Sequence, residues 1–203
     1  CAHALSTPEP PMQPPALALI LQDHQALAQV LRALRDAVDQ AGKSGLPPDF
    51  EALRAMLFYL DEVPSRLHHA SEGELLFPRI RERCPALRPV LDRLEADHER
   101  GESSIRELEH ALTAWQLMGD ARRESFELLL RTYANVYLGH MEVEESYVLP
   151  VAIDYLSPAD WRELEEALTL QRSQHGTSVA HSHRALFERI TAPPALRPSP
   201  CKT

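Results

Sequence analysis

Two segments of the chain place a histidine and a glutamate at the same spacing. They are His68-x-x-x-Glu72 and His140-x-x-x-Glu144, and a proline follows each histidine after ten residues. Residues four apart lie on one face of an α-helix, with about 5–6 Å between their Cβ atoms. Imidazole and carboxylate groups at that distance can bind one metal ion or two neighbouring ions. The repeated spacing therefore predicts metal binding.

Two further histidines extend the repeat. His24 and His98 each follow an aspartate. The offset between these two Asp-His pairs is nearly the same as the offset between the two His-x-x-x-Glu units. The nearly equal offsets indicate an internal duplication of a helix pair.

The apolar periodicity predicts the elements that must position these residues. We expect four long helices, over residues 16–41, 50–83, 86–117 and 120–155, with breaks at 42–48, Cys84-Pro85 and Gly119-Asp120. We also expect Pro64 and Pro78 to bend the second helix. The predicted fold is all-α, an up-down-up-down four-helix bundle, with one or two short additional C-terminal helices within residues 157–191. Residues 1–15 and 192–203 are rich in proline and are expected to be disordered.

The lengths of these helices bring the histidines to one level. An α-helix rises about 1.5 Å per residue. On either side of each of the three breaks, the helical segments between the break and the nearest of these residues therefore have matching lengths, of about 26–28 Å, 18–20 Å and 30 Å in chain order. Leucines and isoleucines flank His24 and His98, so these side chains point inward. Buried carboxylates are too costly to leave unpaired, and two divalent ions sharing carboxylate bridges remove that cost. The set is His24, His68, Glu72, His98, His140 and Glu144.

Glu102 forms a third unit of this spacing, four residues after His98. It is either a terminal ligand or an exposed glutamate, and we include it among the expected metal ligands. Any one of these histidines alone is more simply explained as a hydrogen-bonded core imidazole. The matched heights of the whole set favour the metal site.

Several neighbouring residues receive other roles. We expect His69 to lie at the rim of the site, and Glu145 to be a solvated acid, because each is turned about 100° from its neighbour. Tyr133, Tyr137 and Tyr147 share the helical stripe of His140. They are expected to be packing residues, with a hydrogen bond to a ligand, or electron donation to the metals, as the alternative. A cluster of histidines is expected to be a solvated surface group: His175, His181 and His183.

Composition narrows the class of protein. The 203 residues carry a formal net charge of −9, which disfavours nucleic-acid binding. No apolar run is long enough to span a membrane. The three cysteines, Cys1, Cys84 and Cys201, form no CxxC pair. Their pattern favours a reducing compartment, and we expect a cytoplasmic location.

The chain resembles the hemerythrin-like family, the HHE cation-binding domain, over roughly residues 16–172. The resemblance rests on Asp23-His24 and on the segments RLHHASEGELLFPRIRER, LEADHERGE and YLGHMEVEESYVLPVA. It implies a four-helix bundle around a non-haem di-iron centre, with an oxo, hydroxo or water bridge, that meets dioxygen or a related small molecule.

The resemblance also assigns roles. His24 and His68 would bind one iron, and His98 and His140 the other, with Glu72 and Glu144 as bridging carboxylates. Glu102 would take the place of a further histidine found in the oxygen-carrying members. A second departure is that Glu144 stands four residues after its histidine, where the carriers have an aspartate after five.

These departures favour chemistry or sensing over reversible oxygen carriage, because an anionic oxygen ligand stabilises Fe(III). We expect a di-iron protein that reacts with or senses O2, peroxide or nitric oxide, and an oxidoreductase if it is an enzyme. The alternatives are a non-enzymatic iron- or oxygen-sensing module, an oxygen-binding module, and a metal store or donor holding iron, manganese or zinc. The sequence indicates no oligomeric state.

Overall fold

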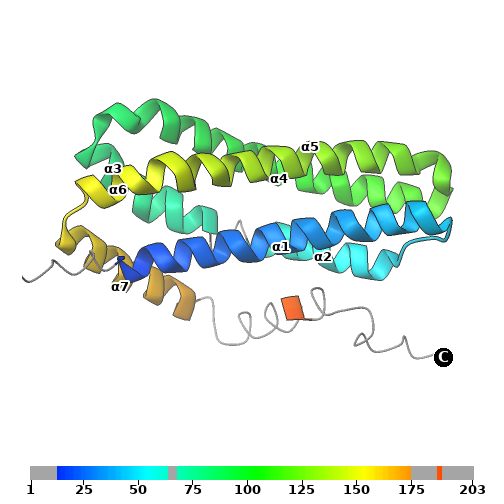
Figure 1. Cartoon of the computed structure of the whole chain (residues 1–203), viewed down its shortest axis with the longest axis horizontal. Coiled ribbons are helices and arrows are strands. Elements are labelled where there is room, and N and C mark those ends of the chain that lie inside the picture. Colours follow the sequence, from blue (N-terminus) through cyan, green and yellow to red (C-terminus); the bar gives the residue numbers. More distant parts are fainter. Residues whose placement is uncertain (1–12, 64–67, 175–186, 189–203) are drawn as a thin grey trace, which may run out of the picture.

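The computed structural model describes residues 13–63, 68–174 and 187–188. Within these ranges all regular secondary structure is helical, and the helices lie side by side as an elongated bundle (Figure 1). The predicted all-helical class is confirmed. Among the described residues, no helix is both long enough and apolar enough to cross a membrane.

Long helices make up the body of the bundle. They are α1 (Pro15–Ser44), α2 (Phe50–Val63), α4 (Arg88–Met118) and α5 (Arg123–Val143). Helices α1 and α4 each pack against both α2 and α5. Helix α1 extends along almost the whole length of the molecule, with α4 and α5 on the other side of the bundle (Figure 1).

Local sequence explains the first connection. Gly45 ends α1 in the left-handed conformation, with φ of 66°, and its N–H donates to the carbonyl of Ala41. Glycine adopts this conformation without the steric cost that a Cβ atom brings. Asp49 then caps α2, since its Oδ1 accepts hydrogen bonds from the N–H groups of Glu51 and Ala52 at 3.1 and 3.0 Å.

The predicted second and fourth long helices are not continuous α-helices. Each contains a π-helical turn, η2 (Ser71–Leu76) and η5 (Glu144–Val148), followed by α3 (Phe77–Arg83) and α6 (Leu149–Tyr155). At η2 the N–H of Phe77 donates to the carbonyl of Glu72, five residues back. At η5 the N–H of Leu149 donates to the carbonyl of Glu144.

The proline after each turn supplies the physical reason. Pro78 and Pro150 have no N–H to donate, so the α-helical ladder is interrupted just before them. The helix accommodates the interruption by widening to the π-helical turn just before each proline. Single π turns of this kind are frequent at functional sites.

Two apolar cores lie on either side of a polar layer. One core joins α1, α2, α4 and α5 through residues such as Leu31, Leu57 and Leu112. The other joins the N-terminal parts of α1 and α4 to α3, α6 and α7 (Pro158–Gln174), with Ile20 and Leu91 among its members. Six of the seven expected ligands are buried in this layer, so the packing on either side fixes their positions.

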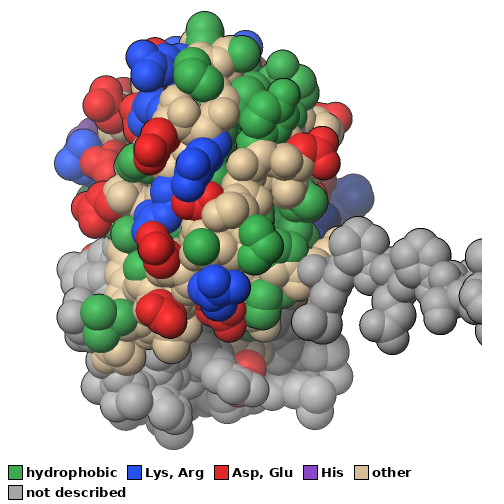
Figure 2. All heavy atoms as spheres, turned by 90° about the vertical axis from the view of Figure 1, so that its left-hand side faces the viewer, with side chains coloured by type: hydrophobic (Ala, Val, Ile, Leu, Met, Phe, Trp, Pro, Cys, Tyr) green, Lys and Arg blue, Asp and Glu red, His purple; other side chains and the backbone are tan. Residues whose placement is uncertain are grey.

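Ion pairs tie the shorter helices to the bundle. Arg81 on α3 donates to Glu95 on α4 at 2.7 and 2.8 Å. Arg83 pairs with Asp160, the residue whose carboxylate also accepts from the N–H of Ser157 at the start of α7. Figure 2 views this end of the molecule and shows acidic and basic side chains interspersed over it.

Some predictions fall outside the described residues. They are the disordered segments, apart from residues 13–15, the effect of Pro64, Cys1 and Cys201, the cluster His175, His181 and His183, and the second C-terminal helix apart from residues 187–188. The first C-terminal helix is present as α7.

Candidate metal centre

Six of the seven expected ligands meet in one layer of the bundle. They form two groups of four, and in each group one donor atom per residue lies within 4.8 Å of the others. One group is His24, His68, Glu72 and Glu144, and the other is Glu72, His98, His140 and Glu144. Both glutamates therefore belong to both groups, as bridging carboxylates between two ions require.

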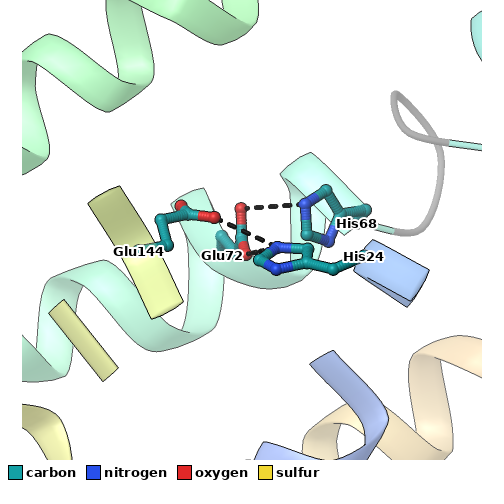
Figure 3. Close-up of side chains that lie close together, drawn as sticks. All are labelled: His24, His68, Glu72 and Glu144. Carbon is teal, nitrogen blue, oxygen red and sulfur yellow. Dashed lines mark ion pairs between the residues drawn. The ribbon is translucent and has the colours of Figure 1, made fainter. Parts of the chain in front are cut away.

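The four imidazoles all present Nε2 to the two carboxylates. The carboxylate oxygens of Glu72 lie 3.5 Å from Nε2 of His68, 3.4 Å from Nε2 of His98 and 3.7 Å from Nε2 of His24. Those of Glu144 lie 3.1 Å from Nε2 of His24 and 3.4 Å from Nε2 of His140. Figure 3 shows how the side chains of the first group converge, from α1, the η2 region and η5.

The centre fits a metal because its polar atoms lack other partners. Both carboxylate oxygens of Glu72 and of Glu144, and Nε2 of His24 and of His68, are buried without a hydrogen bond. Buried polar groups in proteins are almost always hydrogen-bonded, so a cluster of such orphans needs an explanation. Divalent cations bound between the groups supply it, and imidazole with carboxylate suits iron, manganese or zinc.

The buried imidazoles and carboxylates of the centre shift one another's pKa values. Burial alone lowers the pKa of His24, but contacts with Glu144 and Glu72 outweigh it and raise the pKa to about 10. The pKa of His140 is also raised, because Glu144 outweighs burial. Burial lowers the pKa of His68 to about 4. Burial opposes ionisation of Glu72, yet the surrounding imidazoles hold its pKa well below the usual value.

These shifts predict proton release when metal binds. A pKa of about 10 keeps His24 protonated at pH 7, so an ion must displace its proton, whereas His68 is already neutral above about pH 5. The raised pKa of His140 acts in the same direction. We expect Zn²⁺ binding near pH 7 to release at least one proton per chain, and the affinity for Zn²⁺ to rise from pH 6 toward pH 9. Titration with Zn²⁺ in weak buffer containing a pH indicator dye, repeated at several pH values, measures the proton release and the affinity. A pH-independent affinity would contradict the assignment, and His24→Ala should reduce the release by about one proton.

The structure does not bring Glu102 to the centre. Its side chain is exposed on α4 and lies outside both groups of donor atoms. The ring of His69 stacks on His98, with 3.9 Å between ring centroids and 13° between planes. Glu102 instead lines a small cavity beside the centre, together with His69 and Tyr137.

Glu145 has a role that our sequence analysis missed. Its Oε1 accepts a hydrogen bond from Nδ1 of His24 at 2.8 Å, although its side chain is 46% exposed. The expectation of a merely solvated acid is therefore wrong. This bond fixes the tautomer in which Nε2 of His24 faces the centre. Glu145 lies in the π turn η5, where the rotation per residue of an α-helix does not apply.

Removing this support is expected to weaken one ion more than the other. Glu145→Ala should lower the affinity of the His24 and His68 group by about 10–100-fold, the range for residues that orient a metal ligand. The group containing His98 and His140 should be unaffected. Calorimetric titration with Zn²⁺ measures the affinities of the two groups separately. Glu142→Ala, on the exposed side of the same helix, is the matched control, and equal weakening of both affinities would contradict this role.

Two tyrosines of the predicted stripe are buried and one is not. Tyr133 and Tyr137 are 5% and 6% exposed, whereas Tyr147 is 51% exposed. The expectation for Tyr147 fails because the π turn η5 intervenes and shifts the phase of the helix. Tyr137 forms a hydrogen bond of 2.8 Å with Nε2 of His69, the ring that stacks on His98. Tyr137 therefore helps to position His98 indirectly, through His69.

Helix α7 closes the side of the centre near His24. Arg172 on α7 donates to Asp23 at 2.6 Å, and Ser71 donates to Gln171 at 2.8 Å. Burial raises the pKa of Asp23 to about 6, although Arg172 opposes the shift. The C-terminal helix thus holds both η2 and the residue before His24.

The fold and this centre are those of a helical protein with a candidate metal-binding site made of His and Glu donors. Residues 16–152 match the model of the hemerythrin HHE cation-binding domain. This match covers most of the chain, and the chain belongs to the hemerythrin HHE family. No curated protein matches the chain significantly.

Proposed function

We propose that the protein holds two iron ions between Glu72 and Glu144 and that this pair reacts with or senses O2, peroxide or nitric oxide. The framework of the proposal is an up-down-up-down four-helix bundle formed by α1, α2 with α3, α4, and α5 with α6. His24 and His68 would hold one ion, and His98 and His140 the other. Iron would supply the electrons for chemistry with such ligands.

The observation that carries the proposal is the sharing of both carboxylates. Each group of four donors contains the same two glutamates and two histidines of its own. Such an arrangement could hold two ions beside each other, as in the carboxylate-bridged metal pairs of other helical bundles, and this supports the proposal. A single structural ion would need only one of these groups.

The donor set favours chemistry or sensing over oxygen carriage. The centre assembles four imidazoles and two carboxylates, whereas the oxygen carriers that it resembles use five histidines. Fewer imidazole ligands also leave more coordination positions for an incoming small molecule. The chain's own residues bury the centre and orient His24, so that water is largely excluded.

Two alternatives follow from the same centre. In one, metal or oxygen binding alters the stability of the bundle, and a partner senses that change. In the other, the protein stores or donates a metal, including manganese or zinc. Neither requires turnover.

Anaerobic loading with ferrous iron, followed by optical titration with O2, peroxide and nitric oxide, tests the proposal. We expect about two irons per chain and a defined absorption change with at least one of the three ligands. Catalytic consumption of peroxide or nitric oxide supports an enzyme, whereas a stoichiometric spectral change with altered protease resistance supports a sensor. A centre that cycles reversibly through a stable O2 adduct contradicts the preference against carriage, and iron that reacts with none of the ligands supports storage.

A further inference from the structure

A pocket between α4 and α5 reaches the candidate metal centre from one side. Its volume is about 870 Å³, and His98 and His140 are among its lining residues. These two ligands are 8% and 5% exposed, whereas each of the other four is 1% exposed. Among the described residues, the pocket is therefore the side from which the centre is most open.

The pocket is far larger than a diatomic ligand requires. A water molecule, which is similar in size to O2, takes about 30 Å³ in the liquid. Sites for organic molecules usually measure about 300–1,000 Å³. The volume of this pocket, about 870 Å³, falls within that range.

The pocket is also long. Its lining residues extend from Pro89 to Glu107 on α4 and from Leu129 to Tyr147 on α5. Each span corresponds to about 27 Å of α-helix. The two helices are joined by a short turn and run in opposite directions, so Pro89 and Tyr147 lie toward the same end. The shape suits an extended molecule better than a compact one.

Small residues deepen the pocket and apolar residues line it. A Cβ atom added at Gly139 meets no other atom within 4 Å, and one added at Gly101 meets only the ring of Tyr137, at 3.8 Å. Ser104 is a third small lining residue. The apolar lining residues include Val90, Leu94, Leu129, Val136 and Val143. A hydrocarbon chain would bury its surface here.

The charges at the two ends of the pocket differ. Arg93 lies toward the Pro89 end and forms no ion pair within the part of the chain that the structure describes, whereas Arg100, near the middle, is paired with Asp97. Glu107 lies at the opposite end. An anionic head group is therefore favoured at Arg93 and disfavoured at Glu107.

We propose that the pocket between α4 and α5 binds a long-chain monocarboxylate, with its carboxylate at Arg93 and its hydrocarbon chain extending past His98 and His140. The proposal does not depend on the metal, because size, lining and charge are properties of the helices. It goes beyond the reaction with small gases or peroxide. A bound chain would cover the more open side of the centre.

Fluorescence titration with cis-parinarate, a fatty acid that emits in apolar surroundings, tests the proposal on the delipidated full-length chain. We expect saturable binding of one molecule per chain, with or without Zn²⁺, and displacement by palmitate. Hexadecanol, which has the same chain length without the charge, should displace it at least about tenfold less well. Binding without saturation, or no binding, would overturn the proposal whatever the iron chemistry shows.

Three variants locate the ligand. Gly139→Leu and Ser104→Trp fill the pocket and should weaken parinarate binding by at least about tenfold. Arg93→Gln should weaken the binding of parinarate, which carries the same carboxylate as palmitate, and should narrow the advantage of palmitate over hexadecanol as a displacing ligand. The matched control is Gly73→Leu, because an added Cβ there also meets no atom within 4 Å, and Gly73 adjoins a ligand but does not line the pocket.

Further measurements distinguish a fatty acid in this pocket from one bound elsewhere and from a second copy of the chain. Circular dichroism and Zn²⁺ content should show that all four variants fold. Equal binding to wild type and to both filled variants would place the fatty acid elsewhere and overturn the proposal. Light scattering that shows a dimer, dissociated by Gly139→Leu, would assign the pocket to a second copy of the chain and overturn it as well.

Discussion

Glu72→Gln is expected to abolish the binding of both metal ions, whereas His68→Ala is expected to remove only one. Glu72 belongs to both groups of donor atoms, and His68 belongs to one. The loss of affinity in Glu72→Gln should exceed the roughly 10–100-fold typical of residues that only support a ligand. Iron content after anaerobic loading and desalting measures the stoichiometry, and His98→Ala should remove the ion that His68→Ala retains.

Two controls separate lost ligation from lost folding. Glu102→Gln changes an exposed glutamate outside both groups, and it should retain two ions. The Glu72→Gln variant is expected to be less stable than wild type in the absence of metal, because it loses the ion pairs with the imidazoles that hold the pKa of Glu72 low. Circular dichroism of the variant should show that it is still folded at the temperature of the metal-binding measurement. Two ions retained by Glu72→Gln would show that the carboxylate is not a bridge.

Removing the metals is expected to lower the melting temperature by about 15–30 °C. An ion present at about a thousand times its dissociation constant stabilises the folded state by about 4 kcal/mol, so two ions together contribute about 8 kcal/mol. Each kcal/mol shifts Tm by about 2–4 °C in a protein of this size. The effect should be large because the ligand carboxylates are 1% exposed and lack hydrogen-bond partners. Differential scanning calorimetry with and without chelator measures it.

The same experiment on Glu72→Gln supplies the reference. That variant should melt at one temperature irrespective of chelator, since it holds no ion to lose. A wild-type protein whose Tm is insensitive to chelation would show that the orphaned polar atoms are not metal ligands in solution.

Axial positions along the helices are predicted well from this sequence. The constant rise per residue of an α-helix placed His24, His68, His98 and His140 in one layer, and the structure brings them together with Glu72 and Glu144. A π turn adds one residue and moves later residues along the axis by little. Predictions that depend only on position along the helix axis are therefore little affected by the π turns.

Rotational positions are predicted less well. The π turn η5 changes the direction of the residues within and after it, and for that reason Glu145 reaches His24 and Tyr147 turns outward. Neither turn can be derived from apolar periodicity, although the prolines after them are visible in the sequence. Glu102 has the same spacing from His98 as the other two glutamates have from their histidines, yet it is exposed and lies outside both groups of donor atoms. Helical spacing alone therefore does not decide which glutamates reach the centre.

The two groups of donor atoms draw on both halves of the internal repeat. Exchanging His24, His68 and Glu72 for their counterparts in the later half of the repeat turns one group into the other. The two groups are thus equivalent in composition. Each half of the repeat contributes three of the four donors in one group, and the other half contributes the fourth. Neither half therefore contains a complete group of four donors by itself.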